Sequence, residues 1–164
     1  MSLRLHLVIY APSSPQRLID IARLAFSFDF VRSLVIVKPT GMAAQVGLAD
    51  VSKISYKTGR NLLILHSLSE LSEVLRVDKM FVLVHNAEAR NLKDVEIRGD
   101  IAIVVQGGDT PIPKQEIAIA EPITIPVSYG FAIPVADTAI LLFIISECLK
   151  EESRCKVAKG LYDL

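Results

Sequence analysis

Residues 123–144 read ITIPVSYGFAIPVADTAILLFI, an apolar stretch that is interrupted by Pro126, Gly130 and Pro134. A membrane-spanning helix would not carry three such breaks, and a simple buried strand would end at the first proline. The pattern predicts a strand over 123–127, a shaped loop, and a buried helix over about 135–151. Because the prolines fix the backbone and Gly130 frees it, such a loop could hold the polar edge of a small planar molecule.

The rest of the chain alternates short apolar runs with amphipathic segments. Further strands are predicted at 3–10, 33–37, 61–65, 80–84 and 101–105, and further helices at 15–28, about 41–54 and about 67–76. The first of these helices has Ser14 as its N-cap followed by Pro15, and the third begins with a capping box of Ser67 and Glu70.

The apolar runs are continuous and rich in Val, Ile and Leu, which is typical of strands that helices cover on both faces. The alternation therefore predicts a single α/β domain over 1–164, with a parallel sheet of about six strands flanked by helices. In such sheets ligands bind at the carboxyl ends of the strands.

Composition limits the class of protein. The chain has 164 residues, enough for one domain, and half of them are apolar. No apolar run reaches the length of a membrane span, so we expect a cytoplasmic protein with no membrane contact. Cys148 and Cys155 are expected to be buried or interfacial thiols. The three histidines are scattered and no CxxC pair occurs, so no metal site is predicted.

Charge is distributed unevenly along the chain, although the net charge is zero. Residues 1–60 carry eight basic and three acidic side chains, a net charge of +5, and the remainder carries −5. The basic half suggests contact with an anionic partner such as RNA. The alternative is a solvated mixture of charges with no partner.

The predicted fifth strand runs into QGGDTP, residues 106–111. Two glycines at a strand end either let the backbone approach a ligand closely or form an ordinary turn. No GxGxxG or GxxxxGK[ST] motif is present, which argues against nucleoside triphosphate chemistry. The last helix is apolar nearly all round, so we expect a second copy of the chain to cover its outer side.

Three stretches together resemble the SPOUT (α/β-knot) RNA methyltransferases, in particular the SpoU-like branch that methylates ribose 2′-hydroxyls. These stretches are PSSPQRLIDIARLAFSFDFVRSLVIV, IAIVVQGGDTP and ITIPVSYGFAIPVADTAILLFI. The resemblance covers most of the chain, in order, from Pro12 onward.

The resemblance implies a C-terminal trefoil knot over about 80–150, bound S-adenosylmethionine, an RNA substrate (tRNA or rRNA) and a homodimer formed through the C-terminal helix. It implies that Arg23 acts near the reacting 2′-oxygen, with Asp109 as a second catalytic residue and Arg17, Arg23 and Lys38 contacting RNA. It implies that the cofactor is bound by Val84, Gln106, Gly107, Gly108, Ile125, Pro126, Val127, Ser128, Ile133 and Val135.

The chain departs from the family at three positions. Arg17 stands where the family has an asparagine, Asp109 follows the glycines where the family has a glutamate, and Ala132–Ile133–Pro134 replaces Ser-Leu-Asn. Backbone-mediated cofactor binding would survive these changes, whereas catalysis depends on the missing side chains. A non-catalytic RNA-binding or regulatory dimer is therefore the alternative.

A metal-dependent nuclease is a third hypothesis. It would use Asp94 with Glu96, or Glu116 with Glu121, but neither pair has a lysine at a convincing spacing.

Overall fold

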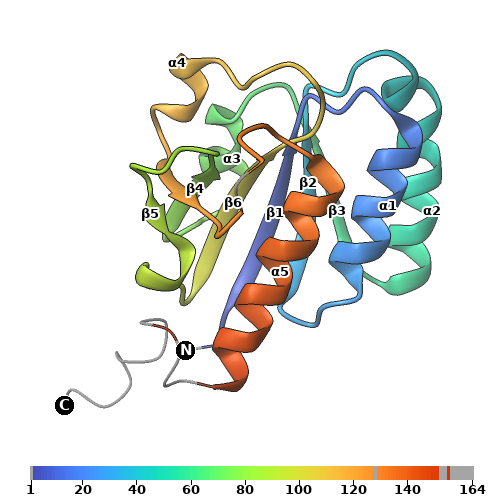
Figure 1. Cartoon of the computed structure of the whole chain (residues 1–164). Coiled ribbons are helices and arrows are strands. Elements are labelled where there is room, and N and C mark those ends of the chain that lie inside the picture. Colours follow the sequence, from blue (N-terminus) through green and yellow to red (C-terminus); the bar gives the residue numbers. More distant parts are fainter. Residues whose placement is uncertain (1, 128, 152–154, 156–164) are drawn as a thin grey trace.

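A parallel sheet forms the centre of the molecule (Figure 1). The computed structural model describes residues 2–127, 129–151 and 155. Within these residues the sheet has seven strands in the order β3-β2-β1-β6-β4-β7-β5, and all paired strands run parallel. The strands are β1 (Arg4–Tyr10), β2 (Val31–Val37), β3 (Asn61–Leu65), β4 (Lys79–Leu83), β5 (Arg90–Asn91), β6 (Asp100–Gln106) and β7 (Glu121–Thr124). The predicted α/β class is confirmed.

Helices occupy the connections between the strands. They are α1 (Pro15–Phe26), α2 (Leu48–Thr58), α3 (Ser69–Val74), α4 (Lys114–Ile117) and α5 (Pro134–Lys150), with a π-helical turn η1 (Ala43–Gly47) and a 3₁₀ turn η2 (Leu92–Asp94). The first helix begins as predicted, because the Ser14 side chain accepts a hydrogen bond from the Arg17 backbone N–H at 3.3 Å and Pro15 takes the first helical position.

The predicted capping box at the third helix does not form. The Ser67 hydroxyl contacts the Ser69 hydroxyl at 2.8 Å, and the Glu70 carboxylate accepts instead from the His66 backbone N–H at 3.0 Å. As a result α3 begins only at Ser69.

The last strand lies earlier in the chain than predicted. It covers Glu121–Thr124, and the Val127 backbone N–H then bonds the Ile125 carbonyl at 2.8 Å in a tight turn. Pro126 has no N–H to donate to a sheet, so the apolar run beyond Thr124 bends away although Ile125 is buried.

The two faces of the sheet are covered unequally. On one face α1, α2 and α5 pack against Leu5, Leu7 and Ile9 of β1 along its whole length (Figure 1). On the other face α3 and α4 cover only the carboxyl half, over Val8 and Tyr10. Side chains alternate between the faces of a strand, so Arg4 and His6 lie on this second face beyond the helices.

The cysteines are buried as predicted, but the prediction that they are thiols was wrong. Cys148 and Cys155 form a disulfide, with their Cα atoms 5.5 Å apart, and both residues are buried. The bridge joins the last turn of α5 to the chain that follows it.

Two large apolar side chains of the helix α5 are exposed. Phe143 is 61% and Leu149 is 41% exposed. No helix in the described part of the chain has the length and apolar character needed to cross a membrane.

Candidate functional site at the carboxyl edge of the sheet

A cavity of about 290 Å³ lies at the carboxyl edge of the sheet. Its walls come from the end of β4, the segment that follows β6, α4, the loop between β7 and α5, and the first turns of α5. They are formed by Val82, Leu83, Val84, His85, Gln106, Pro111, Ile112, Ile117, Gly130, Phe131, Ala132 and Asp137. The interrupted apolar stretch therefore contributes one wall of a pocket, at the edge where ligands of parallel sheets bind.

Asp137 organises the polar part of this cavity. Its side chain is 2% exposed and accepts hydrogen bonds from His85 Nε2 at 3.0 Å, from the Ile133 backbone N–H at 3.2 Å and from the Tyr129 hydroxyl. Burial, and then the hydrogen bond to Asp137, raises the pKa of Tyr129 well above its usual range, so the hydroxyl stays protonated and donates.

The second nitrogen of His85 has no partner. Its Nδ1 atom is buried and makes no hydrogen bond to any residue that the structure describes. With Nε2 bound to Asp137, Nδ1 is the ring atom that is left to contact a ligand. A buried polar atom left unpaired is uncommon in native proteins, and here it belongs to a residue that lines a cavity.

Of the residues predicted to bind the cofactor, Val84 and Gln106 line the cavity. Ile125 lies in the apolar core, Pro126 is exposed, and Val127 and Val135 pack against the core. The Ile133 side chain is exposed while its backbone binds Asp137. Ser128 lies outside the described residues.

The glycine pair is needed for packing against β1 rather than for lining the cavity. A Cβ on Gly107 would lie 2.5 Å from Ile9 Cγ2 and 2.8 Å from the Tyr10 carbonyl oxygen. A Cβ on Gly108 would lie 2.9 Å from the Ala11 carbonyl oxygen. These residues allow a close approach of backbone to backbone, as the sequence suggested, but the partner is the end of β1.

Of the residues predicted to be catalytic or to bind RNA, Arg17 and Asp109 meet, whereas Arg23 and Lys38 form no ion pair with either of them. Arg17 contacts Asp109 at 3.3 Å, next to the glycine turn. Arg23 lies about 9 Å beyond Arg17 along α1 and is exposed. It forms no hydrogen bond or ion pair with the described residues. Lys38 binds Glu116 at 2.5 Å and the Tyr10 hydroxyl at 3.2 Å.

Three of the four carboxylates considered for a nuclease are bound to separate partners. Glu96 pairs with Arg98 at 2.8 Å, Glu116 with Lys38, and Glu121 with Arg90 at 2.9 Å. Within the described residues no group of three or more His, Cys, Asp or Glu side chains is arranged to hold a metal ion.

The predicted strand ends placed His85 and Tyr129 at the carboxyl edge of the sheet, but sequence reasoning assigned no site role to them or to Asp137. His85 follows a predicted strand and Asp137 breaks an apolar helix, but 52 residues separate them. No local spacing connects such residues, and only the shared edge of the sheet could have suggested that they meet.

Solved structures of RNA methyltransferases share this fold. A structure described as concerning 2-OH methylation of C/U34 on tRNA superposes with a TM-score of 0.70 at 18% identity, covering 90% of this chain and 97% of its own. The SpoU methyltransferase AviRb from Streptomyces viridochromogenes, in complex with AdoMet, gives a TM-score of 0.70 at 12% identity over 92% of this chain and 63% of its own. At this identity the likeness concerns the fold alone.

The relatives found by sequence are named as restriction enzymes and not as methyltransferases. A candidate type II restriction enzyme of Aeropyrum pernix is 28% identical over 84% of this chain and 90% of its own length. Another from Methanocaldococcus jannaschii is 29% identical over 70% of this chain and 78% of its own. The family model described as RecB-family nuclease (DUF2122) matches residues 41–144, more than half of the chain, which therefore belongs to that family.

Proposed function

We propose that the chain is an S-adenosylmethionine-dependent RNA methyltransferase that acts on ribose 2′-hydroxyls of tRNA or rRNA. The observation that carries this proposal is the cavity between β4, β6 and the loop before α5. It occupies the edge of the sheet at which α/β proteins bind small molecules. The likeness in fold to methyltransferases, one of them holding AdoMet, supports the proposal.

The residues of the cavity fit the proposed cofactor. Val84, Ile112, Ile117 and Phe131 offer apolar walls for a planar base. The unpaired Nδ1 of His85 is left to form a hydrogen bond with the ligand. A volume of about 290 Å³ is just below the range of about 300–1,000 Å³ that is typical of small-molecule sites. When bound, the cofactor supplies an electrophilic methyl group.

In this proposal the chain works by orientation and electrostatics. An arginine cannot act as a general base at ordinary pH, so Arg23 would stabilise the charge that develops on the 2′-oxygen. The ion pair between Arg17 and Asp109 would fix the edge of the glycine turn and leave Asp109, 90% exposed, free to meet a substrate hydroxyl.

We propose that a homodimer completes the protein. Phe143 and Leu149 expose apolar surface on α5, the helix that the sequence predicted to be covered by a second copy. Phe143→Glu is expected to convert the dimer to a monomer in light scattering coupled to gel filtration. A native protein that is monomeric at micromolar concentration would contradict this.

Cofactor binding is the direct test. The native protein is expected to bind S-adenosylmethionine saturably in titration calorimetry. Ala132→Trp should abolish the heat signal, because Ala132 lines the cavity and an indole would fill it. Ala87→Trp is the matched control, since Ala87 is exposed and outside the lining. Absence of binding to the native protein at millimolar ligand would refute the proposal.

Methyl transfer is tested separately with tritiated cofactor and total tRNA or rRNA. Arg23→Ala should reduce transfer by about 10²–10³-fold while cofactor binding persists. If the native protein binds cofactor and RNA but no RNA accepts a methyl group, the non-catalytic dimer is the better account.

The name of the family suggests a nuclease as a second candidate. Cleavage of nucleic acid that depends on a divalent metal ion, and that Glu116→Gln or Glu121→Gln abolishes, would establish it. We expect no such cleavage, because these carboxylates are held by Lys38 and Arg90 in separate places.

A further inference from the structure

A second cavity, of about 430 Å³, lies at the opposite, amino edge of the sheet. It occupies the part of the sheet face that α3 and α4 do not cover. Its lining includes polar side chains from β1, β2, β3, β6 and the segment after α3: Arg4, His6, Arg32, Asn61, Arg76 and Asp100. Nothing in the proposed methyltransferase function uses this cavity.

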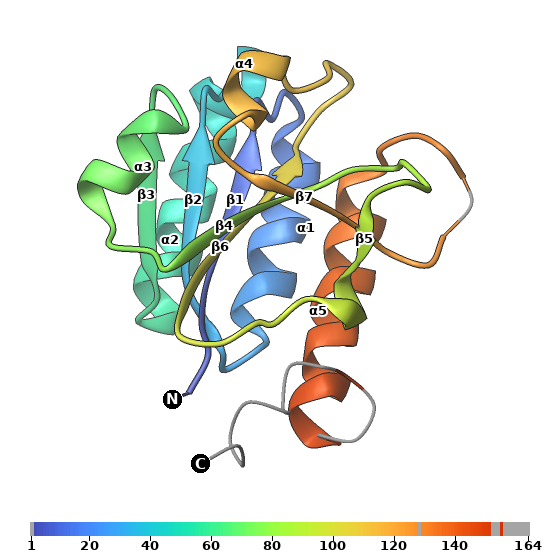
Figure 2. The ribbon, with the colours of Figure 1, turned by 90° about the vertical axis from the view of Figure 1, so that its left-hand side faces the viewer.

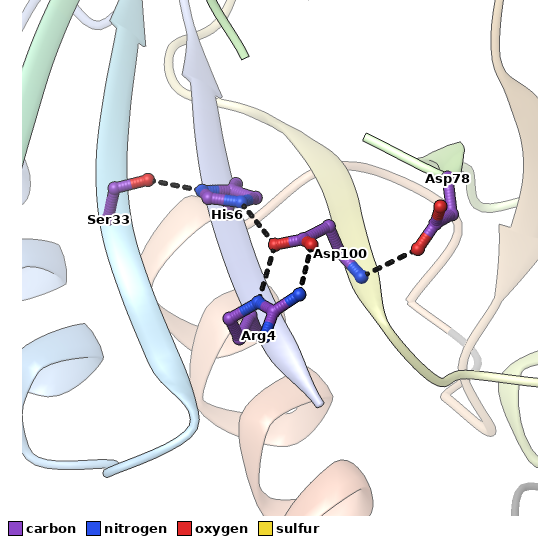
Figure 3. Close-up of polar contacts among 5 residues, drawn as sticks. All are labelled: Arg4, His6, Ser33, Asp78 and Asp100. Atoms are coloured by element: carbon purple, nitrogen blue, oxygen red, sulfur yellow. Dashed lines mark hydrogen bonds and ion pairs between the residues drawn. The ribbon is translucent and has the colours of Figure 1, made fainter. Parts of the chain in front are cut away.

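The floor of this amino-edge cavity is a fixed polar network, drawn in Figure 3. Arg4 and Asp100 face each other across β1 and β6 and form two hydrogen bonds, of 2.8 and 2.5 Å. His6 faces Ser33 across β1 and β2, with Nδ1 2.5 Å from the hydroxyl, and its Nε2 lies 3.4 Å from Asp100 Oδ1. The Asp100 backbone N–H donates to Asp78 at 2.9 Å.

The ion pair of Arg4 and Asp100 in the floor is neutral as a pair. The hydrogen bonds from Arg4 lower the pKa of Asp100 to about 2, so the carboxylate is ionised and balances the guanidinium. Burial lowers the pKa of His6 despite its contact with Asp100. At neutral pH the Arg4–Asp100 pair and His6 therefore add no net charge, and Asp78, which accepts from the Asp100 backbone, adds one formal negative charge. The positive charge of the cavity comes from Arg32 and Arg76.

Two arginines at the rim have no partner. Arg32 and Arg76 are exposed and form neither hydrogen bonds nor ion pairs with any residue that the structure describes. Each guanidinium offers a planar fork of donors that matches a phosphate. Asn61 adds an uncharged polar group to the lining.

The hollow continues beyond this cavity, and the charged residues that it adds there, Arg60 and Asp29, form an ion pair at 3.5 Å. A neighbouring hollow of about 600 Å³ shares Arg4, Arg32 and Asn61 with it. A single free phosphate would fill only part of two connected hollows, whereas successive phosphates of a strand could occupy both. The continuity therefore favours a chain of phosphates as the ligand.

We propose that the amino-edge cavity binds the phosphate backbone of a nucleic acid strand, with Arg32 and Arg76 as its phosphate ligands. The site is about 20 Å from the cavity at the carboxyl edge, the length of β1. The amino-edge cavity would therefore bind the strand about one β-strand length away from the proposed methyl transfer. The proposal does not depend on methyl transfer, since it concerns binding alone.

The experiment measures fluorescence anisotropy of a labelled single-stranded oligouridylate over a series of salt concentrations. For single strands, removing one arginine–phosphate interaction lowers the slope of log K against log salt by about 0.7. Arg32→Gln with Arg76→Gln should lower the slope by about 1.4 and weaken binding on the order of 20-fold at about 0.1 M salt.

A charge-matched control is Lys53→Gln with Lys93→Gln. It removes the same charge from exposed side chains of α2 and η2 that line neither hollow. We expect this control to keep the native slope, and thermal unfolding verifies that both variants fold. Equal losses in the two double variants would overturn the proposal, because only overall charge would then matter.

A second arm titrates inorganic phosphate alone and follows the arginine Nε–H resonances by NMR. Weak shifts at Arg32 and Arg76, together with RNA binding, support the proposal. Shifts at these arginines in a protein that binds no RNA would assign the cavity to a small phosphorylated molecule and overturn the nucleic-acid assignment.

Discussion

The two edges of the sheet have different construction, and Figure 2 shows the strands that connect them. At the carboxyl edge the cavity is built from loops and from the start of α5, with apolar walls and one buried carboxylate, Asp137. At the amino edge it is built on the strands themselves, and its carboxylate, Asp100, is 24% exposed and paired with Arg4. The first arrangement suits an uncharged planar group, and the second suits an anion.

Removing Asp137 should have the largest effect on stability. Asp137→Ala leaves His85, Tyr129 and the Ile133 N–H without their buried acceptor, so we expect the free energy of unfolding to fall by about 3–5 kcal/mol. Urea unfolding of the native protein and the variant, at the same protein concentration, measures this loss in the free energy of unfolding. Asp137→Asn keeps the shape and should lose less. A loss below about 1 kcal/mol for the alanine variant would mean that the network does not hold this edge together.

Gly107→Ala tests whether the glycine turn is fixed by packing. The added methyl group would lie 2.5 Å from Ile9 and 2.8 Å from the Tyr10 carbonyl oxygen, which predicts a loss of about 2–3 kcal/mol in the free energy of unfolding.

Gly41→Ala is the control for the glycine test. Gly41 has a φ of +54° with no heavy atom within 4 Å of an added Cβ, so only backbone strain of about 1 kcal/mol is expected there. An equal loss at the two positions would contradict the packing argument.

At the amino edge we expect Asp100 to make a smaller, pH-dependent contribution to the free energy of unfolding. Its pKa is lowered from 3.8 to about 2 in the folded protein, so the stability it contributes is complete above about pH 4 and is lost as the pH falls through 2. Because the pair with Arg4 is partly exposed, we expect the contribution to be about 1 kcal/mol. Between pH 6 and pH 2 the free energy of unfolding should change less with pH for Asp100→Asn than for the native protein. An equal change in the two proteins would show that the ion pair is not stabilising.

Hydrophobic pattern predicted the central elements well. The strand at 61–65 was placed with its observed ends, and four others lie within two residues of theirs. These runs are continuous and apolar because helices cover them. The two-residue strand β5 (Arg90–Asn91) has no apolar character and takes its conformation from pairing with β7, so sequence pattern could not reveal it.

Features that depend on distant partners were not predictable. The disulfide was missed because a separation of seven residues at the end of a helix does not show whether two thiols meet. His85 and Asp137 meet only through the fold, as do Arg4 and Asp100, which are 96 residues apart. The pairing of β1 with β6 brings Arg4 and Asp100 together, and no local motif encodes that strand order. The trefoil knot remains a prediction.

A crystal structure of the protein grown with S-adenosylhomocysteine would test the central claim most directly. We predict that the adenine ring lies against Val84 and Phe131 in the cavity at the carboxyl edge, with a hydrogen bond between His85 Nδ1 and the ligand. Ligand bound at another place, or crystals from saturating ligand in which this cavity holds none, would contradict the assignment of this edge to the cofactor.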